Sequence, residues 1–134
     1  PQNLEMMIQN DPLFSQVVII GDKRNYLTAL IVPHKDEVLR KARELNLESV
    51  PWETLLKEPA IYQWAEQRLK EKIGHLAPYE QIKYFTFLPQ ELSAAAGELT
   101  PTMKVKRKVM AEKYRHEIEK MYKERTVLKN EANR

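Results

Sequence analysis

The sequence has 134 residues and contains no cysteine, only three glycines and no long apolar run. Without cysteine, disulfide scaffolds, zinc–thiolate sites and thiol nucleophiles are excluded. So few glycines exclude a flexible glycine-rich linker, and no apolar run approaches the about 18 residues that a membrane span needs. No signal-peptide pattern is present at the start. The lack of cysteine agrees with a reducing compartment, and we therefore expect a cytoplasmic protein.

General signatures of metal sites and active sites are missing as well. His34, His75 and His116 are too far apart to form a local ligand pair, so no metal site is expected. The sequence has no glycine-rich phosphate loop, no serine nucleophile elbow and no His-Glu-x-x-His motif. A self-contained active site is therefore not visible.

The first third of the chain predicts a helix followed by a β-hairpin. Apolar residues at positions 4, 7 and 8 have helical spacing, and the helix is expected to end at Asp11-Pro12. Two runs rich in β-branched residues, 16–20 and 26–32, flank a charged turn at 21–25. Both runs are almost continuously apolar, which predicts that both faces of the sheet are covered.

The rest of the chain is predicted to be mainly helical. Asp36 stands near the start of one helix, as its cap or in its first turn, and Pro59 opens a longer helix. The expected elements are a helix at 36–47, a short helix or turn at 51–56, a helix at 59–77, a strand at 82–88, a loop at 90–103 and a helix at about 106–122. This order predicts an α+β fold, in which a small mixed sheet (the hairpin plus one later strand) packs with about three to four helices.

The basic residues are concentrated near the end of the chain. Residues 103–134 contain eleven Lys and Arg and five Asp and Glu, a net charge of +6, whereas residues 1–102 sum to −3. A basic segment of this kind favours an anionic partner, although a solvated helix face explains it too. Residues 124–134 show no clear pattern, so we expect the domain to span 1–123 and be followed by a disordered tail.

One segment in this basic region has the character of a site. Residues 97–108, Gly-Glu-Leu-Thr-Pro-Thr-Met-Lys-Val-Lys-Arg-Lys, form a turn-rich loop that leads directly into a basic helix. Lys104 lies at the junction, where its side chain can project from the domain and neutralise a phosphate or a carboxylate. Cations at a helix N-terminus oppose the helix dipole, which favours an anionic partner for these lysines.

This segment resembles the lysine motif of long-chain fatty acyl-coenzyme A synthetases, in the adenylate-forming, AMP-binding ligase superfamily. Two further segments are similar to the C-terminal domain of that family: the hairpin at 18–33, Val-Ile-Ile-Gly-Asp-Lys-Arg-Asn-Tyr-Leu-Thr-Ala-Leu-Ile-Val-Pro, and 76–82, Leu-Ala-Pro-Tyr-Glu-Gln-Ile. The resemblance covers nearly everything up to about Tyr122. One departure is Met103, because most members of the superfamily have glycine immediately before the lysine.

The resemblance implies that Lys104 is the catalytic lysine, which contacts the fatty-acid carboxylate and the α-phosphate of ATP. Lys106 is the competing candidate, and Lys104 fits the register of a lysine followed by a basic pair better. Thr100, Thr102, Lys106 and Arg107 are then expected to form the loop around substrate and nucleotide. In the charged turn, Asp22, Lys23 and Arg24 are candidates for contacts with coenzyme A or with a partner domain.

The resemblance also implies a longer enzyme of which this chain is the C-terminal lid. Such an enzyme uses ATP and Mg²⁺, bound mainly by an N-terminal domain, and coenzyme A as co-substrate, with fatty acid as the acyl donor. The small domain rotates between an adenylating and a thioester-forming pose. We expect residues 1–123 to be a fragment of that enzyme and to have no turnover in isolation.

Two alternatives stay open. The chain could be a non-catalytic basic module that binds nucleic acid or an anionic membrane through residues 104–129, although it lacks interleaved aromatic residues and a known reader motif. It could also be the lid of a ligase that passes the acyl group to a carrier protein. If the chain is the lid of a fatty acyl-CoA ligase, we expect no nucleic-acid partner, and peripheral membrane association of the full-length enzyme is compatible with this interpretation.

Overall fold

The computed structural model describes the backbone of residues 2–132 and the side chains of residues 3–123. Within this range there are six α-helices, one short 3-10 helix and three strands. In chain order they are α1 (Gln2–Gln9), β1 (Phe14–Ile20), β2 (Leu27–Pro33), α2 (Lys35–Glu44), α3 (Trp52–Leu55), α4 (Pro59–Ile73), η1 (Pro78–Glu80), β3 (Ile82–Phe87), α5 (Arg107–Lys113) and α6 (Arg115–Ala132).

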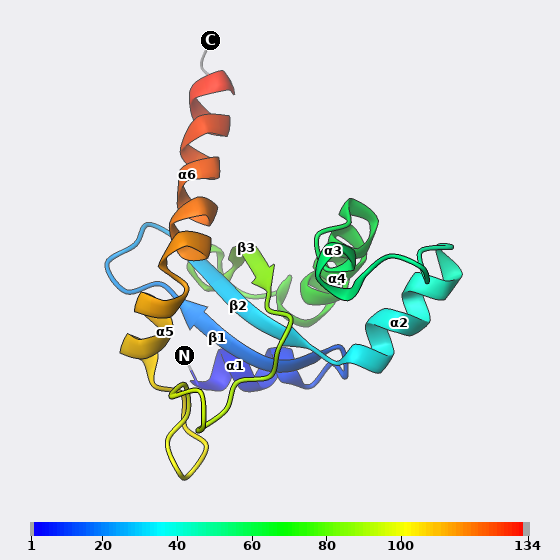
Figure 1. The fold of residues 1–134 in the computed structure, drawn as a ribbon. Coiled ribbons are helices and arrows are strands. Elements are labelled where there is room, and N and C mark those ends of the chain that lie inside the picture. The colour runs from blue at the N-terminus through cyan, green and yellow to red at the C-terminus, as the bar shows by residue number, and fades with distance from the viewer. Residues whose placement is uncertain (1, 133–134) are drawn as a thin grey trace.

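The strands form one mixed sheet in the order β1-β2-β3, with β2 in the centre (Figure 1). β1 and β2 are antiparallel, and Val18 is the partner of Leu30. β3 is parallel to β2 and places Thr86 beside Leu30. The long return through α2, α3 and α4 makes this parallel pairing possible, because a parallel pair needs a crossover connection. The predicted α+β class, with a hairpin and one later strand, is confirmed.

One face of the sheet is covered by the helices of the first half of the chain. Val17, Ile19, Ala29 and Ile31 project into a core that α1, α2, α3 and α4 complete. The residues of α4 at 61, 65, 69 and 73 recur at every fourth position and are all buried on this face. Pro59 occupies the first turn of this helix, as expected.

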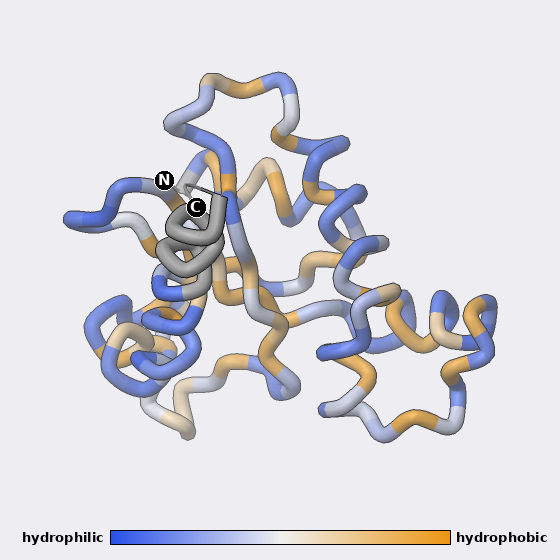
Figure 2. Tube along the Cα trace, turned by 90° about the horizontal axis from the view of Figure 1, so that it is seen from above, coloured by the Kyte–Doolittle hydropathy of each residue, from blue (hydrophilic) through white to orange (hydrophobic). Residues whose placement is uncertain are grey.

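The opposite face is covered by the C-terminal part of the chain. Val18, Leu30 and Val32 pack with Leu99, with Met110 of α5, and with α6. The continuously apolar strands are therefore explained by a sheet with a core on both sides, as the sequence predicted. Figure 2 shows short hydrophobic and hydrophilic stretches mixed along the trace. No helix within the described residues is long and apolar enough to cross a membrane.

Of the two places predicted for Asp36, the structure has it in the first turn of α2, which begins at Lys35 with His34 as its N-cap. One predicted detail differs. The final helix, predicted to run unbroken over about 106–122, is divided at Tyr114 into α5 and α6, which adds to the helix count. The backbone of α6 is helical up to Ala132, and the expected tail at 124–134 lies outside the residues whose side chains are described.

Candidate functional site

The Lys104 segment folds as a short β-ribbon that ends in a tight turn. Leu99 and Val105 form an antiparallel bridge, and one pair beyond it the Thr100 N–H donates to the Lys104 carbonyl at 2.8 Å. The Met103 N–H donates to the Thr100 carbonyl at 2.8 Å and closes the turn over Pro101 and Thr102. We call residues 98–106 the lysine ribbon; it lies in the yellow segment that projects at the edge of the molecule in Figure 1.

Met103 adopts a left-handed backbone conformation, with a φ of 67°. A turn followed by a left-handed residue is a common way to close a three-residue hairpin loop, and glycine is the residue that tolerates this position best. The glycine that most superfamily members have before the lysine therefore has a backbone explanation at this point of the ribbon. Met103 occupies the same place with its side chain 65% exposed.

Lys104 is exposed at the end of the lysine ribbon. Its N–H donates to the Thr100 hydroxyl at 3.0 Å, and that hydroxyl lies 3.1 Å from the Thr102 hydroxyl. The two predicted threonines thus fix the backbone around Lys104. Lys104 is thus an exposed residue beside the turn that closes the ribbon, a place from which a point charge can reach an anion on another surface.

Lys106 lies at the opposite end of the ribbon. It is the N-cap of α5, and its N–H donates to the Glu98 carbonyl at 2.8 Å. Its side chain is exposed. Lys106 is therefore part of the ribbon's base, while Lys104 lies at the tip, which supports the preference for Lys104 as the reaching residue.

Glu98 is a buried carboxylate at the base of the ribbon, only 2% exposed. Oε1 accepts from the Ser93 N–H at 3.1 Å, and Oε2 accepts from the Lys113 ammonium at 3.0 Å and the Tyr114 hydroxyl at 2.9 Å. Burial alone would raise the pKa of Glu98, but these donors outweigh it and hold the pKa below its usual value. Burial and the bond to Glu98 raise the pKa of Tyr114 to about 12.

Arg107 is held against α1 and β1 in this structure. Its guanidinium binds the buried carboxylate of Glu5 in α1, at 2.8 Å and 3.0 Å, and lies 3.4 Å from the Ile19 carbonyl. Glu5 also accepts from the Ile19 N–H at 2.9 Å. Arg107 thus fastens the start of α5 to α1 and β1. Its predicted place in the substrate loop is not tested by this contact and stays a prediction.

The charged turn between β1 and β2 faces α6. Arg24 forms an ion pair with Glu119, and its guanidinium lies 4.4 Å from the centre of the Tyr122 ring. The hydrogen bond between Arg24 and Glu119 raises the pKa of Arg24 and lowers that of Glu119. Asp22 and Lys23 are exposed in the same turn. Their predicted contacts with coenzyme A or a partner domain are likewise untested.

Sequence reasoning found the lysine ribbon but missed the residues that anchor it. Glu98, Lys113 and Tyr114 come together across a sequence distance of 15 and 16 residues, and Glu5 meets Arg107 across 102. Pairs at such distances leave no periodic signal. Within residues 97–108, the one sequence feature that points to this anchor is Glu98, the single acidic residue of the segment, which precedes the apolar Leu99.

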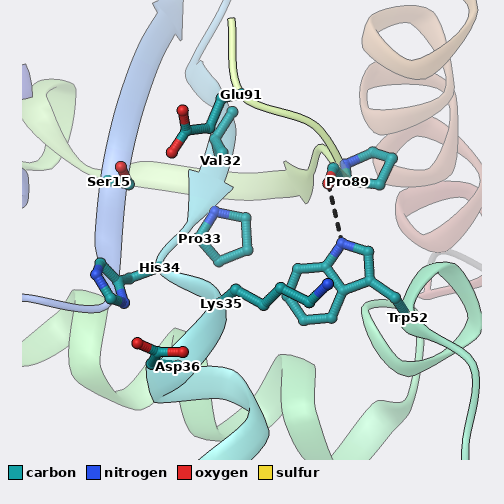
Figure 3. Close-up of a pocket in the computed structure, with 9 residues that line it drawn as sticks. All are labelled: Ser15, Val32, Pro33, His34, Lys35, Asp36, Trp52, Pro89 and Glu91. Carbon is teal, nitrogen blue, oxygen red and sulfur yellow. Dashed lines mark hydrogen bonds between the residues drawn. The ribbon is translucent and has the colours of Figure 1, made fainter.

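Lys104 lines neither of two cavities in the described part of the chain. A cavity of about 320 Å³ is lined by Trp52 and by the end of β2 and the start of α2, and Trp52 Nε1 donates to the Pro89 carbonyl at 2.9 Å (Figure 3). Another, of about 230 Å³, adjoins Tyr114 and β3. Among the described residues no group of three His, Cys, Asp or Glu side chains could hold a metal ion.

The domain is a small mixed sheet with a core on each face, from which the lysine ribbon projects. Residues 1–126 match the family described as the AMP-binding enzyme C-terminal domain. Because the match covers nearly the whole chain, the protein belongs to that family.

Relatives and solved structures agree with this family. The chain is 36% identical over 124 residues to the long-chain-fatty-acid–CoA ligase FadD15 of Mycobacterium tuberculosis, covering 91% of this chain and 20% of that protein. It is 26% identical to the long-chain-fatty-acid–[acyl-carrier-protein] ligase AEE15 of Arabidopsis thaliana, covering 91% and 15%. The fold is similar to the adenylation domain of a carboxylate reductase from Mycobacterium chelonae, with a TM-score of 0.66, 25% identity and coverage of 90% and 17%. The chain thus spans about a fifth of the length of the curated relatives it matches.

Proposed function

We propose that the chain acts as the mobile C-terminal domain of a long-chain-fatty-acid–CoA ligase and that Lys104 is its catalytic lysine. The ligase activates a fatty acid with ATP to an acyl-adenylate and transfers the acyl group to coenzyme A. The observation that supports this most is the exposed Lys104 at the tip of the lysine ribbon, in a chain that is 36% identical to a named long-chain-fatty-acid–CoA ligase.

Adenylation brings two anions together. A carboxylate oxygen of the fatty acid attacks the α-phosphorus of ATP, the bond to pyrophosphate breaks, and pyrophosphate leaves. The Lys104 ammonium offsets the repulsion between carboxylate and phosphate and holds both in line for attack. Its charge acts when the ribbon closes over a site on the larger N-terminal domain, where ATP and Mg²⁺ are bound, so no step on this domain involves the metal.

Thioester formation needs a different arrangement. The coenzyme A thiol attacks the acyl carbon of the adenylate and AMP leaves, so the charge of Lys104 is no longer required between two reactants. Rotation of the small domain withdraws the ribbon and presents another face to the site. The isolated chain has no turnover, because the reactants are held by the other domain.

Two lysine substitutions in the full-length ligase test this proposal. Lys104→Ala removes the charge between the reactants and should lower the rate of acyl-adenylate formation by about a hundredfold or more. Thioester formation from supplied acyl-adenylate should change by no more than about threefold. Lys106→Ala, at the ribbon base, tests the competing candidate and should lower adenylation much less than Lys104→Ala does. Both half-reactions are followed as pyrophosphate release and as acyl-CoA formation.

Two results of that experiment would contradict the proposal. One is an equal loss of both half-reactions in Lys104→Ala, which would indicate a structural role. The other is a selective loss of adenylation in Lys106→Ala while Lys104→Ala stays active, which would move the catalytic role to Lys106.

One observation supports acyl-carrier protein as an alternative acceptor of the acyl group. The chain is 26% identical to a relative named as a ligase for acyl-carrier protein, which is lower than its 36% identity to FadD15. We therefore place coenzyme A first. A product assay of the full-length ligase with both acceptors separates the two, because each acceptor gives a different thioester.

A further inference from the structure

Glu98 connects the lysine ribbon to the domain in two ways. Through its backbone it joins the two sides of the ribbon, because its carbonyl accepts from the Lys106 N–H at 2.8 Å. Through its side chain it fastens the ribbon to the last residue of α5 and to the residue that follows, Lys113 and Tyr114. Glu98 is thus the point at which the ribbon leaves the body of the molecule.

This attachment is stronger than an ordinary surface contact. The Glu98 side chain is 3% exposed, whereas Lys113 is 43% exposed and brings its ammonium inward to reach it. A carboxylate taken out of water is stabilised only if its oxygens are hydrogen-bonded and its charge is compensated. Both oxygens of Glu98 are hydrogen-bonded. The geometry at the ribbon's base is therefore specified by several directional bonds at once.

A small change in the orientation of the ribbon's base displaces the residues at its tip. From the pair of Glu98 and Lys106 to the pair of Thr100 and Lys104, each side of the ribbon advances by two residues, which is about 7 Å. A tilt of about 10° at the base therefore moves the Lys104 backbone by about 1 Å, and the end of its side chain by more. A displacement of about 1 Å in a reacting group can cost about a hundredfold in rate.

We propose that Glu98 is a positioning residue for Lys104: its buried carboxylate, bonded to Lys113 and Tyr114, sets the direction in which the lysine ribbon projects during adenylation. This inference rests on the proposed role of Lys104. Glu98 itself touches no substrate. Its contribution belongs to the adenylating half-reaction alone, because the ribbon is withdrawn during thioester formation.

The test uses Glu98→Gln in the full-length ligase, a change that keeps the shape of the side chain but removes its charge. The kcat of acyl-adenylate formation should fall about tenfold or more, while KM for ATP and for fatty acid stays within about twofold. Thioester formation from supplied acyl-adenylate should also stay within about twofold. Tyr114→Phe keeps the ring and removes one donor, so it should give a smaller loss in the same direction.

Asp11→Asn is the matched control for loss of a buried carboxylate. Asp11 is 5% exposed, accepts from the Leu13 N–H at 2.9 Å and pairs with Arg68 of α4, on the opposite side of the sheet from the ribbon. Asp11→Asn should lower the free energy of unfolding without changing the ratio of the two half-reaction rates. A merely structural role of Glu98 would give the same pattern as this control.

The outcomes separate the inference from the proposed function. If Lys104→Ala, assayed alongside, loses adenylation selectively and both Glu98→Gln and Tyr114→Phe leave the ratio of half-reactions unchanged, the role of Glu98 is overturned and that of Lys104 stands. If Lys104→Ala itself shows no selective loss, the proposed function is overturned and the inference falls with it. If Glu98→Gln does not fold, the ratio in Tyr114→Phe decides.

Discussion

At the scale of the residue, the backbone of Met103 is in a conformation that suits glycine better. The left-handed region costs a non-glycine residue about 1–2 kcal/mol, and the exposed Met103 side chain gives little burial in return. The chain therefore keeps a strained residue immediately before the proposed catalytic lysine.

We expect Met103→Gly to stabilise the domain. Relief of the left-handed strain exceeds the about 0.5–1 kcal/mol that glycine adds to the conformational freedom of the unfolded chain. The free energy of unfolding, measured by urea denaturation, should rise by about 0.5–1 kcal/mol. Thr102→Gly, in the same turn but without a positive φ, is the control and should lower it. A loss of stability in Met103→Gly would show that the left-handed conformation is not strained.

At the scale of the element, the ends of the chain's last helices depend on a few polar side chains. The Tyr122 hydroxyl of α6 donates to the Tyr26 carbonyl at 2.9 Å, lies 3.3 Å from the Ile20 carbonyl, and accepts from the buried Thr28 hydroxyl at 3.3 Å. These bonds attach α6 to the ends of β1 and β2. Arg24 adds its ion pair with Glu119 at the same place.

Tyr122→Phe should loosen this attachment while keeping the aromatic packing. Removing hydrogen bonds from half-buried partners costs about 1–3 kcal/mol. Hydrogen exchange of the α6 amides at 115–122 should become faster, while exchange in α4, on the other face of the sheet, should not change. Lys120→Ala, on the exposed side of α6, serves as the control. Unchanged exchange of α6 in Tyr122→Phe would show that these bonds do not hold the helix.

The break between α5 and α6 shows why an element can be predicted while its interruption cannot. The apolar residues Met110, Ile118 and Met121 keep helical spacing across Tyr114 and are all buried in one cluster. Backbone bonds also bridge the break, from the Tyr114 N–H to Met110 and from the Ile118 N–H to Tyr114. The periodic signal is therefore continuous, and the break lies in the backbone of Tyr114, whose φ of −109° and ψ of 25° are outside the helical region.

At the scale of the whole molecule, the two-sided sheet was predictable and the polar anchors were not. The continuous apolar composition of β1 and β2 indicated two covered faces, and turn residues fixed the hairpin. The predicted mixed sheet implied one parallel pair, but the sequence could not show that β2 is the partner of β3, or that Glu5 and Glu98 hold the two ends of α5. Such contacts join residues far apart in the chain, so tertiary packing determines them and local pattern does not.

The charge distribution is also a property of the whole molecule. The basic residues of 103–134 include Lys104 at the tip of the ribbon, whereas Arg107 and Lys113 are paired with carboxylates. Part of the basic segment is therefore used to hold the domain together. Some cations of the segment are paired within the domain and others are exposed. Net charge alone therefore favoured an anionic partner but could not identify the cation that contacts this partner.

The most direct measurement is the crystal structure of the full-length ligase with a non-hydrolysable analogue of the acyl-adenylate. With the small domain in the adenylating pose, the account predicts the Lys104 Nζ atom within about 3 Å of an analogue oxygen, and Glu98 still bonded to Lys113 and Tyr114. A closed site in which Lys104 points into solvent and Lys106 or another cation contacts the analogue would contradict it.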